Sequence, residues 1–232
     1  MTDYLLFIDT EASGLPKRWD VPYAKQGNWP HAVQIAWVIY NRDGEEIKHQ
    51  NHYINDEDFE ITNSAKKIHG ITREFLNANG EPREKVMALL ANDLIFYQPL
   101  VIGHFMELDF HVVGVEFYRT GIENPLNDLR SFCIMLATTH MVRNPAKKYL
   151  RLADLYHILF NATLEHQHDA IVDARATATC FFELIKRGEL DDNKIEQQRL
   201  MLKPNTATAN KQGCSTLMLL FIMILLITIL YA

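Results

Sequence analysis

The sequence is poor in cysteine and has no excess of positive charge. Its three cysteines, Cys133, Cys180 and Cys214, are widely spaced and form no Cys-x-x-Cys pair. This excludes a disulfide framework and a zinc-site spacing, and it is typical of a reducing compartment. The 23 lysines and arginines are outnumbered by 29 acidic residues. An overall basic surface that grips nucleic acid is therefore excluded, although a local basic patch is not.

The N-terminus lacks a basic segment ahead of its short apolar run, so we expect no secretory signal peptide. Disorder is also excluded, because 48% of the residues are hydrophobic and 22% are charged. A chain of 232 residues has room for one α/β domain with a full core and a short appendage. We assign that domain to residues 1–202.

One long hydrophobic run is present at the other end of the chain. Residues 215–232 carry no charge, and at about 1.5 Å per residue they would span a bilayer core as a helix. A buried core helix is the alternative, but the run has no polar face. The polar stretch 203–214 reads as a linker. Because Lys203 and Lys211 lie on the N-terminal side of the hydrophobic run, we expect a single-pass C-terminal membrane anchor with the large domain facing the cytoplasm.

Apolar patterns predict a mixed sheet with helices packed on it, an α/β fold. Tyr4–Ile8 has the pattern of a buried strand, and Val33–Tyr40 and Ile47–Ile54 read as a hairpin around an Asp-Gly turn. Strands and helices then alternate. We predict strands at Leu100–Gly103 and near Leu126–Arg130, and helices over Arg83–Tyr97, Leu108–Thr120, Phe132–His140, Leu152–Phe160 and Ala170–Arg187.

Two carboxylates follow the first predicted strand. Asp9 and Glu11 are two residues apart, so on a strand they point to the same face, about 7 Å from one another. Like charges at this distance are unfavourable unless a cation lies between them, and a divalent ion with oxygen ligands relieves the repulsion. An exposed strand end is the alternative for an isolated Asp-x-Glu.

Three further residues complete a candidate site. Asp109 lies at the start of a predicted helix, where an acid also complements the helix dipole without any catalytic role. His168 precedes Asp173 by five residues in a stretch rich in alanine. Small side chains let this helix lie close to the sheet, which would bring Asp173 toward the other acids, with His168 on a more mobile rim.

In this order the pattern resembles the DEDDh branch of the proofreading-type 3′→5′ exonucleases. The segments that carry the resemblance are FIDTEASGL, GHFMELDF and HDAIVDARAT, together with IHGIT at residues 68–72, and it covers roughly residues 4–187. The resemblance implies a ribonuclease H-like fold, a mixed five-stranded sheet flanked by helices. It also implies release of nucleoside 5′-monophosphates from the 3′ end of DNA or RNA.

The resemblance further assigns roles to individual residues. Two divalent cations, Mg²⁺ or Mn²⁺, would be held by Asp9, Glu11, Asp109 and Asp173, one activating a water and the other stabilising the leaving oxygen. His168 would be the general base. The terminal nucleotide would be cradled by Thr10, Ala12 and Leu15.

Two features depart from the family pattern. Phe105 stands where the family usually has Asn after the second-motif His, and residues 15–32 form an insertion beside the predicted acids. Trp19, Tyr23 and Trp29 of this insertion either stack on bases or pack the insertion onto the domain.

A run of basic residues without intervening acids lies further along the chain, at Arg143, Lys147, Lys148 and Arg151. It either touches the phosphate backbone or belongs to a solvated loop.

Two other functions are compatible with the same residues. The segment at 197–202 is similar to a clamp-binding peptide, which suggests a polymerase proofreading subunit, but a membrane tail disfavours a replisome component. A catalytically inactive membrane-tethered nucleic-acid-binding or scaffolding module is the second. Because all four acids and the histidine are present, we favour the enzyme.

Overall fold

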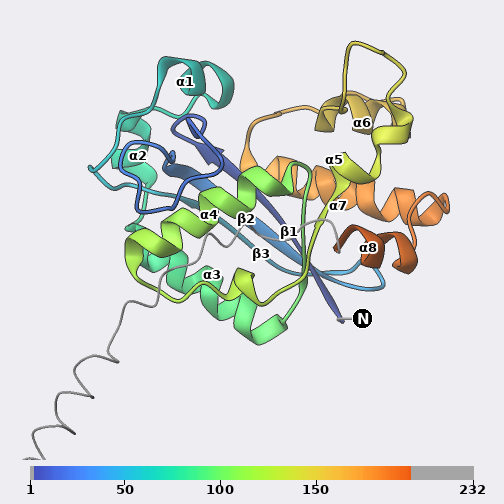
Figure 1. Cartoon of the computed structure of the whole chain (residues 1–232), viewed down its shortest axis with the longest axis horizontal. Coiled ribbons are helices and arrows are strands. Elements are labelled where there is room, and N and C mark those ends of the chain that lie inside the picture. The colour runs from blue at the N-terminus through green and yellow to red at the C-terminus, as the bar shows by residue number, and fades with distance from the viewer. Residues whose placement is uncertain (1–2, 200–232) are drawn as a thin grey trace, which may run out of the picture.

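The computed structural model describes residues 3–199. The predicted linker at 203–214 and the predicted anchor at 215–232 lie outside the described residues. Among residues 3–199, no helix has the length and apolar character that crossing a membrane requires. Figure 1 shows a twisted central sheet with helices on both faces.

The sheet has five strands in the order β3-β2-β1-β4-β5. β1 pairs antiparallel with β2 and parallel with β4, β2 pairs antiparallel with β3, and β4 pairs parallel with β5. The strands are β1 (Tyr4–Ala12), β2 (Ala32–Asn41), β3 (Glu46–Tyr53), β4 (Leu100–Gly103) and β5 (Ser131–Cys133). This confirms the mixed five-stranded sheet that the motifs predicted.

Side chains of β1 alternate between two hydrophobic cores. Leu6 and Ile8 pack into the core beneath α3 (Arg83–Tyr97) and α4 (Met106–Thr120). Leu5 and Phe7 pack into the core beneath α6 (Leu152–Phe160) and α7 (Ala170–Lys186). Because successive strand residues point to opposite faces, Asp9 and Glu11 belong to the α7 face and Thr10 to the α4 face.

Short helices complete the domain. α1 (Asn63–His69) and α2 (Arg73–Asn79) follow β3, and each is N-capped by a threonine side chain. α8 (Asp192–Arg199) covers the edge strand β5. The Gln198 side chain accepts from the Cys133 N–H at 2.6 Å and donates to the Cys133 carbonyl at 2.9 Å, so it satisfies an open strand edge.

The sequence prediction was wrong in one region. The segment predicted as a strand, Leu126–Arg130, begins in the 3-10 helix η1 (Pro125–Asn127), because Pro125 lacks an N–H and the Asn124 side chain caps the Leu126 N–H. The strand follows as β5.

The predicted helix Phe132–His140 is correspondingly shorter. Phe132 and Cys133 pair with β4 instead, so only α5 (Ile134–Ala137) and the 3-10 helix η2 (Thr139–Met141) remain.

Candidate active site

Two acidic residues of the site lie within β1. The strand continues four residues past the predicted end at Ile8, because Asp9 pairs with Ala36 and Glu11 with Gln34 of β2. The register shifts directly after Glu11. Such an irregularity bends a strand and re-aims the side chains beside it.

Asp109 reaches the same place from the first turn of α4. Asp109 is 4% exposed, and its carboxylate accepts a hydrogen bond from the Thr10 hydroxyl at 2.8 Å. Gly103, the last residue of β4, makes this approach possible. A Cβ at that position would lie 3.0 Å from Asp109 Oδ2 and 3.2 Å from the Met106 Cα.

Asp173 lies in the first turn of α7, which packs closely on the sheet because Ala170 and Ala174 are fully buried. Oδ2 of Asp173 accepts from the His168 N–H at 3.0 Å. Its other oxygen, Oδ1, is buried without a hydrogen-bond partner. This orphaned oxygen lacks a partner that water or protein would normally supply.

His168 stands just ahead of α7 with its side chain exposed and its φ at +65°. Possible ligand atoms of Glu11, His168 and Asp173 lie within 4.8 Å of one another. Glu11 thus meets two residues that lie 157 and 162 positions further along the chain.

The acids raise one another's pKa values. Burial and, after it, the charges of Asp173 and Asp109 together raise the pKa of Glu11 to about 8. Burial raises the pKa of Asp109 to about 7, against hydrogen bonds from Thr10 that lower it. The pKa of Asp9 is also raised, first by burial and then by Asp109 and Asp173. Among residues 3–199, no lysine or arginine lowers the pKa of these three acids.

A divalent cation fits this cluster. Four carboxylates converge from β1, α4 and α7, and one buried oxygen of Asp173 has no partner. Carboxylate oxygens are the ligands that Mg²⁺ and Mn²⁺ prefer. A bound cation would supply the missing positive charge and the missing partner together.

The acids line a cavity of about 710 Å³. Thr10, Ala12 and Leu15, the predicted nucleotide-binding residues, line it as well. One side is formed by α1 and the other by residues 149–153 at the start of α6. Leu15 and Ile68 leave 72% and 56% of their surfaces exposed at this cavity, so it offers apolar surface beside the acids.

Two polar residues that sequence reasoning missed hold α7 in place. The Gln34 side chain donates to Asp169 Oδ1 at 2.8 Å and accepts from the Ala170 N–H at 3.2 Å. Asp169, the N-cap of α7, also raises the pKa values of Glu11 and Asp173. A signal was present, since Gln34 is the single polar residue in an otherwise apolar strand from Ala32 to Tyr40.

The insertion at 15–32 packs mainly onto α4. Trp29 is 5% exposed and stacks on His111 at a ring distance of 4.8 Å. The Tyr23 hydroxyl lies 3.0 Å from His111 Nδ1. Packing therefore accounts for both side chains, whereas Trp19 remains partly exposed. Leu15 is the residue of this insertion that lines the cavity, and Phe105 lines it from the start of α4.

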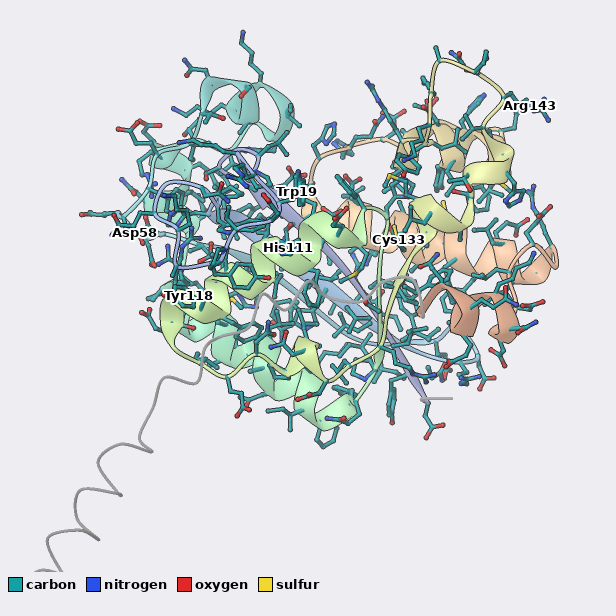
Figure 2. All side chains as sticks on the ribbon, viewed as in Figure 1. Trp19, Asp58, His111, Tyr118, Cys133 and Arg143 are labelled. Carbon is teal, nitrogen blue, oxygen red and sulfur yellow. The ribbon has the colours of Figure 1, made fainter. Side chains whose placement is uncertain are left out.

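The four residues of the basic run also differ in whether they reach the cavity. Arg151 lines the cavity. Lys147 pairs with Asp154 at 3.0 Å, and Lys148 lies over the Tyr149 ring at 5.0 Å. Figure 2 shows Arg143 on the outer loop before α6. Of the four, Arg151 is thus the cation placed beside the acids.

Comparison with known protein families matches residues 6–181 to the exonuclease family (RNase_T). The chain belongs to this exonuclease family. The match confirms the resemblance to the DEDDh exonucleases of the ribonuclease H-like superfamily. A comparison with curated proteins found no match.

Solved structures share the fold. The zinc-bound complex of Escherichia coli exonuclease I with single-stranded DNA is 18% identical with a TM-score of 0.67, covering 86% of this chain and 45% of that chain. The exonuclease I of Methylocaldum szegediense is 20% identical with a TM-score of 0.64, covering 83% and 41%. This exonuclease-family chain thus spans less than half the length of either.

Proposed function

We propose that this chain is a metal-dependent 3′→5′ exonuclease that releases nucleoside 5′-monophosphates from nucleic-acid 3′ ends. The observation that carries the proposal is the convergence of Asp9, Glu11, Asp109 and Asp173, with His168, on one cavity. Carboxylates brought this close without a cation raise one another's pKa values, which is unfavourable for a purely structural cluster.

In this proposal the four acids would hold two divalent cations, Mg²⁺ or Mn²⁺, which would lower the pKa of the attacking water and stabilise the charge on the leaving 3′ oxygen. His168 takes the proton of that water through a ring nitrogen. The hydrogen bond from its backbone N–H to Asp173, and the approach of a ring nitrogen to within 4.8 Å of Glu11 and Asp173 oxygens, support this role. The exposed position of the ring lets it pass the proton on to solvent.

The terminal nucleotide is held by the cavity walls. Thr10 and Ala12 lie between and beside the acids on β1, and Leu15 and Ile68 present apolar surface to the base. These contacts involve no base-edge recognition, so we expect all four bases to be accepted. The similar E. coli enzyme was solved with dT13 and dA16 oligonucleotides, which makes single-stranded DNA the first substrate to test.

The test uses the full chain with 5′-labelled and 3′-labelled single strands of DNA and of RNA, in Mg²⁺, Mn²⁺ or EDTA. We expect the 5′-labelled strand to shorten progressively and the 3′ label to leave first as a mononucleotide, only with metal. Asp109→Asn should abolish release. Glu107→Gln, an exposed acid on the same helical turn, should not.

A folded wild-type chain that releases no nucleotide from either strand with either metal would contradict the proposal. Retained strand binding under those conditions would instead support the alternative of an inactive nucleic-acid-binding or scaffolding module.

We also propose that residues 215–232 anchor the chain in a membrane, with the exonuclease domain on the cytoplasmic side. The support is the uncharged 18-residue run in the sequence. The full chain should float with phospholipid vesicles, and a Leu220→Arg and Leu225→Arg double variant should stay in the soluble fraction. Equal flotation of the two proteins, or none by either, would contradict the anchor.

A further inference from the structure

The insertion at 15–32 holds Trp19 in a fixed position near the active-site cavity. The Asn28 side chain brackets Arg18, accepting from its N–H at 3.0 Å and donating to its carbonyl at 2.8 Å. The ends of the insertion are joined, since the Ser13 N–H donates to the His31 carbonyl at 2.8 Å. The residue next to the bracketed Arg18 is Trp19.

Residues of α4 hold the insertion in place through hydrogen bonds and close packing. Arg119 donates to the Trp29 and Pro30 carbonyls at 3.0 and 2.9 Å. Tyr23 packs so closely over Gly114 that a Cβ there would lie 2.5 Å from the Tyr23 hydroxyl oxygen. The insertion is therefore a preorganised part of the domain, and its exposed side chains lose little entropy on binding.

Trp19 is the exposed member of an aromatic cluster. Its ring lies 6.3 Å from that of Trp29, 5.9 Å from that of His111 and 6.1 Å from that of Phe105. Trp19 is 37% exposed, whereas Trp29 and Trp37 are 5% and 0% exposed. Figure 2 shows Trp19 over the N-terminal half of α4, the half that carries Asp109, with Tyr118 at the opposite end.

Phe105 connects Trp19 to the cavity. It lines the cavity together with the four acids, and its ring contacts Trp19 on the outside. Aromatic surface therefore continues from the cavity wall to the solvent-exposed face of the insertion. A strand whose 3′ end reaches the acids must leave the cavity, and this pair offers its next bases a stacking surface.

Charge favours base contact over phosphate contact at this point. Arg18 is neutralised by Asp20, which it contacts through two hydrogen bonds of 3.0 and 2.7 Å. Stacking on an aromatic ring uses the π-face that every base has, and it is available only when the base is unpaired.

We propose that Trp19, supported by Phe105, stacks on an unpaired base upstream of the 3′-terminal nucleotide and so selects single-stranded ends. The inference rests on the proposed function for the position of the 3′ end. It adds a specificity-determining residue in the insertion, the region that departs from the family pattern.

The test measures binding separately from cleavage. Full-length wild type, Trp19→Ala, Trp19→Phe and Tyr118→Ala are titrated with fluorescent dT2 and dT8 in Ca²⁺, with strand integrity checked on gels. We expect Trp19→Ala to weaken dT8 binding roughly 5- to 100-fold and Trp19→Phe to restore most of it, because stacking needs a ring. Tyr118→Ala, which removes an aromatic side chain that is 54% exposed on α4, should bind as wild type.

Two further readouts exclude a merely structural effect. Binding of dT2 should be unaffected by Trp19→Ala, since so short a strand does not extend past the cavity. Tryptophan fluorescence of the wild type should be quenched by dT8, and Trp19→Phe should remove that quenching. In Mg²⁺ the Ala variant should show a raised KM with kcat unchanged.

The outcomes separate this inference from the proposed function. If 3′ ends are hydrolysed but Trp19→Ala binds dT8 as tightly as wild type, the stacking role is wrong and the exonuclease stands. Loss of dT2 and dT8 binding in equal measure also contradicts it. If Trp19 quenching and length-dependent binding occur without hydrolysis, the stacking role stands and the catalytic proposal fails.

Discussion

At the residue scale, the site concentrates negative charge where little water reaches it. Burial raises the pKa values of Glu11, Asp109 and Asp173, and the charge of Asp173 adds to the rise for Glu11 and Asp109. Hydrogen bonds from Thr10 and from the His168 backbone offset only part of this repulsion. Without a cation, the cluster is thus destabilising near neutral pH.

The pH dependence of stability follows from these pKa values. The pKa of Glu11 rises from 4.5 to about 8 on folding, so between these values the folded chain holds a proton that the unfolded chain has lost. Its contribution to the free energy of unfolding therefore falls as pH rises through this range. Glu11→Gln removes the repulsion, and each 1 kcal/mol regained should raise Tm by about 2–4 °C in a domain of this size.

Thermal melts in EDTA at pH 5.5 and pH 8 check this. The Tm difference between Glu11→Gln and wild type should be larger at pH 8. The matched variant Glu107→Gln should follow wild type at both values. A Tm difference that does not change with pH would show that Glu11 is not perturbed by its neighbours.

His168 permits a variant that separates activity from folding. Its φ of +65° is strained for most residues, but asparagine tolerates this conformation well. His168→Asn should therefore keep the wild-type Tm and lose about 100- to 10,000-fold in kcat, the usual contribution of a general base. Single-turnover nucleotide release measures kcat, and activity within threefold of wild type would rule out the proposed proton transfer.

At the element scale, the site forms where strand ends and helix N-termini meet. β1 supplies two acids, and the first turns of α4 and α7 supply one each. Gly103 lets α4 approach the end of β4. Gln34 joins β2 to α7, so the position of Asp173 depends on a side chain from the antiparallel half of the sheet.

Gln34→Glu tests that junction with almost no change of volume. A carboxylate cannot donate to Asp169 and would repel it, so the start of α7 should shift away from β1. We expect a loss of about 1–3 kcal/mol in stability and at least a tenfold fall in kcat, measured by urea unfolding and nucleotide release. The control variant Gln50→Glu should keep both the stability and kcat near wild type, because the Gln50 side-chain oxygen accepts from His52 Nε2.

On the scale of the whole molecule, one buried carboxylate joins the insertion to the domain. Glu116 is fully buried and contacts Arg83 at 2.6 Å, Arg119 at 2.7 Å and the Ala32 N–H at 2.8 Å. Arg119 in turn holds the end of the insertion. The contacts of this network reach β2, α3 and the end of the insertion, so its role is to fix the insertion and β2 against α3 and α4.

Glu116→Ala would leave two partly buried guanidinium groups without their shared partner. We expect a loss of about 3–5 kcal/mol, or a Tm lower by roughly 6–20 °C. Asp154→Ala, which removes the exposed pair with Lys147, should cost less than about 1 kcal/mol. Calorimetry of the two variants decides the point, and equal losses would mean that burial adds nothing to the Glu116 network.

Local pattern in the sequence was sufficient for much of the fold and for the candidate acids. Strand alternation and helical spacing predicted β1, the β2–β3 hairpin, α3, α4, α6 and α7, because each element buries a regular apolar face. The order of Asp9, Glu11, Asp109, His168 and Asp173 in the chain predicted a shared site through its resemblance to the DEDDh exonucleases, which the spacing of any one pair would not have done.

Only the tertiary structure decided the rest. Gln34 meets Ala170 across 136 positions, and Trp19 meets Phe105 through an insertion that carries no periodic pattern. β5 is a strand because β4 and Gln198 satisfy its backbone, although its three residues are too few to show alternation. Such contacts depend on long-range packing and hydrogen bonding, which leave no local signal in the order of the residues.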